Sequence, residues 1–118
     1  MSSFRMERIN KELLREIVYL LEFSIKEDAV KNAVIMSVDC SRDLKYAKVW
    51  FTTYTEEGRE SILEALKSVA GQLRRMMGER MHLRTTPQLE FCLDKSQDYG
   101  RRIDSLLDEL AVKSKESE

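Results

Sequence analysis

The sequence lacks the long apolar runs of membrane proteins. Its longest stretches without a charged residue are only 7 residues long, at 32–38 and 49–55. A membrane-spanning helix needs about 20 apolar residues. The N-terminus interleaves charged and apolar residues and contains no apolar core of a signal peptide. We therefore expect a soluble, cytoplasmic protein with no membrane association.

Histidine and cysteine are also scarce, which argues against a metal site. The chain has one histidine, His82, and two cysteines, Cys40 and Cys92, with no C-x-x-C spacing. A zinc site needs three or four protein ligands. Both cysteines border strand-like segments, so we expect buried or half-buried free thiols. The position of His82 at a predicted helix end favours a structural role.

Motifs of catalysis and nucleotide binding are missing as well. No G-x-x-x-x-G-K or G-x-G-x-x-G loop is present. Glu56 and Glu57 are adjacent and point in different directions, so they make a poor acid–base pair. They are better placed to oppose the dipole of a helix that follows them. We predict no catalytic residue and no cofactor, and we do not expect an enzyme.

Net charge is nearly absent, although charged residues make up 35% of the chain. The 20 Lys and Arg residues against 21 Asp and Glu give −1, which excludes a nucleic-acid coat held by bulk charge. The charges are segregated, however. Residues 67–84 contain five basic residues and one acidic residue, whereas residues 104–118 contain five acidic and two basic residues. A nucleic-acid site would lie in the basic stretch, although a solvated helix face is the commoner explanation of such a run.

Apolar residues at spacings of three and four predict the helices. They cover 5–22, 57–70, a continuation from 73 to about 82, and 101–111. Gly71 separates the second and third segments, so we predict a kink or a change of direction there. Met76, Met77 and Met81 share this helical spacing and are expected to lie in the core.

Short runs rich in β-branched and aromatic residues predict strands at 33–38, 46–53 and 88–94. A turn at 39–43 makes the first two a hairpin. The order α-β-β-α-kink-α-β, with a short C-terminal helix, predicts an α+β domain. Its three-stranded sheet is covered by helices on one face. The domain spans 1–111, and a polar tail at 112–118 is expected to fray.

The basic stretch provides the candidate RNA contacts. Arginine binds phosphate through two parallel hydrogen bonds, and a break at Gly71 would expose backbone N–H groups to an anion. This favours binding of structured RNA through its backbone. The candidate contacts are Lys67, Gly71, Arg74, Arg75, Arg80 and Arg84, with Arg42, Lys45 and Lys48 on the hairpin.

Two aromatic residues on the second strand offer a different kind of contact. Tyr46 and Trp50 alternate with the core-facing residues of the strand, so they lie on its more exposed face. They could stack on bases, or the helix at 101–111 could cover them. We favour cover, because the apolar stripe of that helix must find a surface.

Four segments of this sequence closely resemble the ribosome-binding factor A family. They are Arg5-Met-Glu-Arg-Ile-Asn-Lys-Glu-Leu, Ser41-Arg-Asp-Leu-Lys-Tyr-Ala-Lys-Val-Trp, Leu83-Arg-Thr-Thr-Pro-Gln-Leu-Glu-Phe and Asp94-Lys-Ser-Gln-Asp-Tyr-Gly-Arg-Arg-Ile. The resemblance covers about residues 5–110. The interhelical Ala-x-Gly of the family reads Val69-Ala70-Gly71 here, so the glycine matches and the first alanine does not.

The resemblance implies a type II KH-like fold and a bacterial assembly factor that is not an enzyme. It implies binding to the small (30S) ribosomal subunit and assistance in late maturation and processing of 16S ribosomal RNA. It also implies a role in cold adaptation, as in cold shock, and removal by an assembly GTPase. We expect a monomer.

Two other classes of protein stay open at this point. One is a different KH-type module that binds single-stranded RNA by stacking, against which the missing G-x-x-G counts. The other is a small α+β regulatory or interaction domain for a metabolite or a protein.

Overall fold

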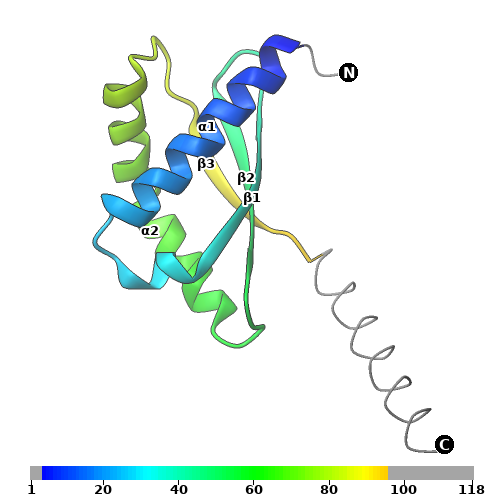
Figure 1. The fold of residues 1–118 in the computed structure, drawn as a ribbon, viewed down its shortest axis with the longest axis vertical. Helices are drawn as coiled ribbons and strands as arrows, with labels where there is room; N and C mark the ends of the chain where they lie inside the picture. Colours follow the sequence, from blue (N-terminus) through cyan, green and yellow to red (C-terminus); the bar gives the residue numbers. More distant parts are fainter. Residues whose placement is uncertain (1–3, 96–118) are drawn as a thin grey trace, which may run out of the picture.

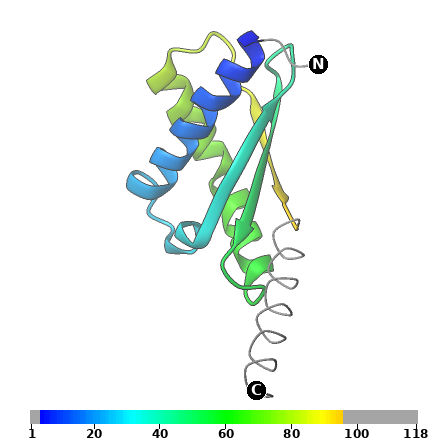
Figure 2. The ribbon, with the colours of Figure 1, turned by 45° about the vertical axis from the view of Figure 1, so that its right-hand side comes forward.

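Two long helices pack on one face of a three-stranded sheet (Figures 1 and 2). The computed structural model describes residues 4–95. Helix α1 covers Phe4–Phe23, a 3-10 helix covers Asp28–Asn32, and α2 covers Arg59–Met81; the strands are β1, Ala33–Cys40, β2, Tyr46–Thr53, and β3, Gln88–Leu93. This confirms the predicted α+β order, except that a 3-10 helix is added and that the single helix α2 takes the place of the two helical segments predicted on either side of Gly71. The predicted helix at 101–111 and the tail at 112–118 lie outside the described residues.

The sheet has the order β1-β2-β3 and mixes two kinds of pairing. Strands β1 and β2 form the predicted antiparallel hairpin, whose register shifts between Ile35 and Ser37. Strands β2 and β3 are parallel, from Tyr46 opposite Gln88 to Phe51 opposite Leu93. Parallel neighbours need a crossover connection, and α2 provides it.

Strand β1 is two residues longer than predicted, so the turn begins later. The N–H of Cys40 donates to Asn10 Oδ1 at 2.9 Å, which ties the end of β1 to α1. Asp43 then closes the turn: its Oδ1 accepts from Ser41 Oγ at 2.7 Å and from the N–H of Lys45 at 3.1 Å. The Ser41 hydroxyl, followed by the Lys45 N–H, holds the pKa of the Asp43 carboxyl below its ordinary value. Asn10 has no sequence pattern that predicts this contact.

The core lies between the helices and the inner face of the sheet. Alternate residues of β2 face it as predicted, since Ala47, Val49 and Phe51 are almost completely buried. Both helices contribute an apolar stripe; its most buried members are Leu13, Ile17 and Leu20 from α1, and Leu66, Leu73 and Met77 from α2. Met76 and Met81 are half-buried against this cluster. The prediction that the methionines are core residues is therefore confirmed for Met77, whereas Met76 and Met81 lie at the edge of the core.

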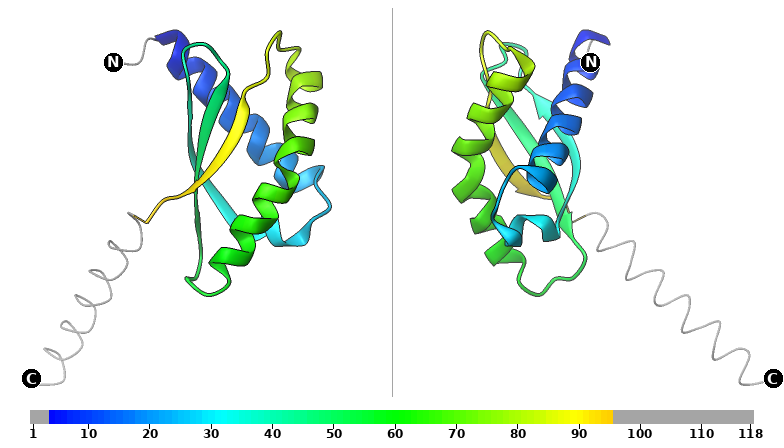
Figure 3. Two further views of the ribbon diagram at one scale, coloured as in Figure 1. Left: turned by 180° about the vertical axis from the view of Figure 1, so that it is seen from behind. Right: turned by 60° about the vertical axis from the view of Figure 1, so that its left-hand side comes forward.

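Helix α2 is continuous through Gly71. Its axis changes direction near the middle (Figure 3, left), but the helix is bent rather than divided into two. The N–H groups around Gly71 are therefore used inside the helix. The expectation that a break exposes them to an anion was wrong, because the backbone hydrogen bonds of a helix can continue through a bend.

The second glycine of α2 has a packing role that the first does not. A Cβ built on Gly71 meets nothing within 4 Å, whereas one built on Gly78 lies only 2.6 Å from Thr86 Oγ1. Gly78 thus allows α2 to contact the segment that follows it. Sequence reasoning missed Gly78, because a close approach between segments leaves no signal in helical spacing.

The two glycines should respond oppositely to alanine. Gly71→Ala should raise the free energy of unfolding by about 0.5–1 kcal/mol, because alanine favours the helix and finds open space. Gly78→Ala should lower it by about 1–3 kcal/mol, because the methyl group displaces Thr86. Urea unfolding followed by circular dichroism measures both. Equal destabilisation by the two variants would contradict this difference.

Candidate nucleic-acid interface

A basic groove runs along the exposed face of α2, beside the segment that joins α2 to β3. Gly71, Arg74, Arg75 and Gly78 recur at spacings of three and four, so they share one face of the helix. Residues 83–86 form the other wall, and the open groove between them has a volume of about 620 Å³. Within the part of the chain that the structure describes, Glu79 is the one acidic side chain that lines it. The groove therefore carries positive charge over a floor that contains two glycines.

Arg74 is bound to the opposite wall of the groove. Its Nε and Nη2 donate to the carbonyl oxygen of Thr86 at 3.1 and 3.0 Å. The residue is still exposed, so its charge contributes to the potential of the groove. Two of its donor nitrogens, however, already have a partner within the chain.

Arg75 and Arg84 are the cations with the freest side chains in this groove. Both are exposed, and neither side chain makes a hydrogen bond or ion pair within residues 4–95. Lys67 precedes Gly71 by one helical turn and lies 3.6 Å from Glu64 Oε1, with both side chains largely exposed. Such a surface pair is weak, so Lys67 stays available, although it lines a neighbouring pocket rather than the groove itself.

Arg80 lies on the other side of α2 from the groove. It follows Gly71 by nine residues, which is two and a half turns of helix. Its Nε donates to Glu16 of α1, and its guanidinium lies 4.4 Å from the centre of the Tyr19 ring. The Glu16 carboxylate accepts this hydrogen bond and raises the pKa of Arg80, because it stabilises the charged guanidinium. The structure thus does not bring Arg80 together with the other predicted contacts.

The three basic residues of the hairpin do not form one group either. Arg42 and Lys45 lie in the turn, which shares one end of the molecule with the 82–87 segment (Figure 1). The N–H of Gln88 donates to the Lys45 carbonyl at 2.8 Å and connects the two segments. Lys48 is instead on the open face of the sheet, opposite Asp39 on β1 and Glu90 on β3. Those carboxylates offset its charge.

The open face of the sheet also carries the aromatic pair and one thiol. Tyr46 is 60% exposed, and Trp50 is half-buried opposite Cys92. Cys40 and Cys92 are both free, as predicted. Burial, followed by neighbouring carboxylates, raises the pKa of each thiol, so both are protonated and poorly nucleophilic at neutral pH.

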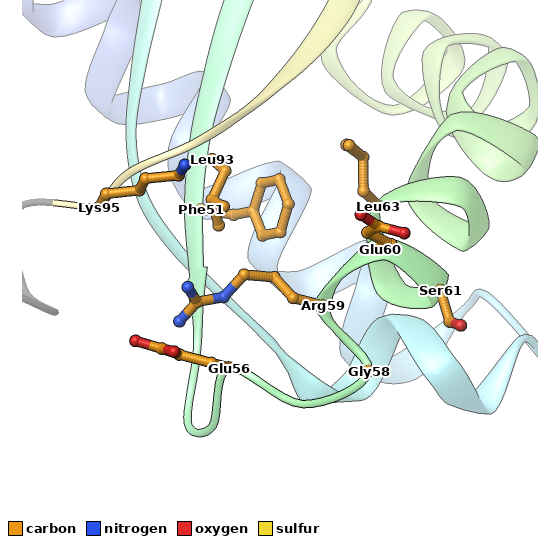
Figure 4. Close-up of a pocket in the computed structure, with 9 residues that line it drawn as sticks. All are labelled: Phe51, Glu56, Gly58, Arg59, Glu60, Ser61, Leu63, Leu93 and Lys95. Atoms are coloured by element: carbon orange, nitrogen blue, oxygen red, sulfur yellow. The ribbon is translucent and has the colours of Figure 1, made fainter.

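A second pocket of about 520 Å³ lies at the other end of α2 (Figure 4). Arg59 and Lys95 line it together with Glu56 and Glu60, so its charges are balanced. Arg59 Nε also donates to Thr53 Oγ1 at 2.8 Å. The pocket is a poorer place for a polyanion than the basic groove. No group of three metal-ligating side chains lies together within residues 4–95.

The sequence of the chain matches one family over most of its length. The family model described as ribosome-binding factor A matches residues 5–107. Ribosome-binding factor A of Thioalkalivibrio sulfidiphilus is 38% identical over 112 residues, which are 94% of this chain and 87% of that protein. The chain belongs to the ribosome-binding factor A family. The Clostridium tetani member is also 38% identical, with 93% of each chain covered.

Solved structures of ribosome-binding factor A share this fold. The crystal structure of the Thermus thermophilus factor matches with a TM-score of 0.66 and 22% identity, covering 75% of this chain and 94% of that one. The solution structure of a Thermotoga maritima protein described as a putative member matches with a TM-score of 0.65 and 23% identity, covering 81% and 92%. A model of the Thermus factor fitted into the map of a 30S complex matches with a TM-score of 0.56 and 21% identity, covering 80% and 97%.

Membership confirms the predicted fold and class. The structures of ribosome-binding factor A have a KH-like fold, and the family consists of ribosome-binding factors rather than enzymes. No helix within residues 4–95 is long and apolar enough to cross a membrane.

From the sequence, Arg80 and Lys48 were grouped with the site because a sequence pattern gives the face of one element on which a residue lies. It does not give how the faces of different elements are oriented relative to one another.

The contact between Arg80 and Glu16 should stabilise the fold. Arg80→Ala and Glu16→Gln should each lower the melting temperature, and the double variant should lower it by less than the sum, because both remove one interaction. Thermal unfolding by circular dichroism measures this coupling. Arg75→Ala is the control, since Arg75 makes no such contact. Strict additivity of the two losses would contradict a direct stabilising contact.

Proposed function

We propose that this protein binds the small ribosomal subunit by laying the groove between α2 and residues 83–86 on the backbone of ribosomal RNA. The observation that carries the proposal is the concentration of positive charge on one helix face, beside two glycines and an arginine-bearing segment. Arginine side chains suit phosphate because they donate two parallel hydrogen bonds. The Thermus thermophilus family member fitted into the map of a 30S complex supports the choice of partner.

The contacts divide into three groups according to their place in the fold. Arg75 and Arg84 bind phosphates directly, and the open space at Gly71 admits the RNA backbone. Lys67 extends the contact along α2, and Arg42 and Lys45 extend it at the hairpin end. Arg80 and Lys48, which were predicted as contacts, have a smaller part because nearby carboxylates offset their charges.

Among residues 4–95, no aromatic side chain lines the groove. Binding therefore depends on RNA shape and phosphate position rather than on stacked bases. This favours a ribosomal site over the alternative of a module for single-stranded RNA, which reads bases by stacking. The exposed Tyr46 of β2 lines a different pocket, together with Leu63 and Lys67 of α2.

The resemblance to the family supports the biological part of the proposal. The protein acts in the cytoplasm as a monomer, on late intermediates of the small subunit. It assists maturation of 16S ribosomal RNA, supports growth in the cold, and leaves with the help of an assembly GTPase. None of these steps requires a catalytic residue or a cofactor of its own.

Charge reversal in the groove tests the assigned face. Arg75→Glu with Arg84→Glu should abolish cosedimentation with small subunits and leave the circular dichroism spectrum unchanged, because both side chains are exposed. In the wild type, affinity should fall steeply with salt. Each phosphate contact adds about 0.7–0.9 to the slope of log K against log salt concentration.

The matched control makes the same change in net charge at the other end of the molecule. Lys26→Glu with Lys31→Glu alters two exposed lysines around the 3-10 helix. These changes should leave cosedimentation close to that of the wild type. If the groove variant binds as well as the wild type, or if both variants lose binding equally, the groove is not the contact surface.

A further inference from the structure

The segment between α2 and β3 is fixed at both ends, whereas Arg84 lies in its exposed part. The chain leaves α2 at His82, which adopts a left-handed conformation with φ of 52°. It enters β3 after Pro87, which is fully buried, and the N–H of Gln88 donates to the Lys45 carbonyl. Arg84 and Thr85 are exposed between these points. The direction of the Arg84 side chain therefore depends on what holds residues 83–86 against α2.

Two residues of α2 hold this segment, and both act on Thr86. Arg74 donates to the Thr86 carbonyl through Nε at 3.1 Å and Nη2 at 3.0 Å. One turn later, Gly78 leaves the space that the Thr86 side chain fills, since a Cβ there would lie 2.6 Å from Thr86 Oγ1. The two donor nitrogens of Arg74 and the space beside Gly78 thus fix Thr86 from two positions on one face of α2.

We propose that Arg74 is a positioning residue, which holds residues 83–86 so that Arg84 faces the groove beside Arg75. The inference rests on the proposed function, because it assigns different roles to the arginines of that groove. Arg75 and Arg84 bind phosphate, and Arg74 acts mainly through the Thr86 carbonyl. The planar fork of a guanidinium matches one acceptor with two nitrogens, which the single ammonium of lysine cannot reproduce.

A charge-conserving substitution separates positioning from direct phosphate binding. Arg74→Lys keeps the positive charge but loses one of the two donors, so it should raise the Kd for small subunits about as much as Arg84→Ala does. Arg15→Lys is the matched control, because Arg15 is exposed on α1 and lies outside the groove. It should keep the Kd within about twofold.

A double-mutant cycle then tests whether Arg74 acts through Arg84. In the Arg74→Lys background, Arg84→Ala should cause little further loss, because Arg84 is already misplaced. In the Arg75→Ala background, Arg84→Ala should cause its full loss. If the effects of Arg74→Lys and Arg84→Ala multiply as independent factors, or if Arg74→Lys binds like the wild type, Arg74 is not a positioning residue.

Trypsin gives a readout that does not depend on the ribosome. The enzyme cleaves after Arg84 faster when the segment is loosened, so Arg74→Lys and Gly78→Ala should both accelerate this cleavage, while Arg75→Lys should not. Unchanged cleavage in Arg74→Lys overturns the positioning role. Faster cleavage together with unaltered binding of Arg84→Ala overturns the proposed groove instead, and leaves the Arg74 contact with a purely structural role.

Discussion

The parallel pairing of β2 with β3 is the constraint on which the rest of the structure depends. Parallel neighbours cannot be joined by a tight turn, so the chain must cross over the sheet, and α2 fills that connection. The crossover buries Leu66, Leu73 and Met77 against the strands. It also returns the chain through residues 82–87 to the beginning of β3. The two walls of the basic groove, α2 and residues 83–86, therefore belong to the same crossover connection.

Burial of one face of α2 determines which charges can meet a partner. Because the apolar stripe faces the sheet, Arg74 and Arg75 are directed outward on the opposite side. Arg80, nine residues after Gly71, comes instead to the contact with α1, where Glu16 and Tyr19 engage it. One basic stretch of sequence thus supplies both a surface for a polyanion and a contact between two helices.

The hydrophobic pattern was sufficient to predict most elements, because core-facing residues recur with the period of the element that carries them. Strand β2 matches its prediction from Tyr46 to Thr53. The pattern could not predict features that depend on contacts between residues far apart in the chain. Strand β1 continues to Cys40, which pairs with Ala47 and whose N–H donates to Asn10 on another element. A kink or change of direction was predicted at Gly71, and α2 does bend near its middle, but the close neighbour belongs to Gly78, which no pattern singled out.

The sequence alone determined the α+β class, the absence of metal-ligand and nucleotide-binding motifs, and the concentration of basic residues in one stretch, since these follow from local spacing and composition. Only the tertiary structure decided which of those basic residues act together. It paired Arg80 with α1, placed Lys48 between two carboxylates and bound Arg74 to Thr86. The reason is physical: spacing fixes the face of an element on which a side chain lies, whereas its partner is fixed by the packing of elements far apart in the chain.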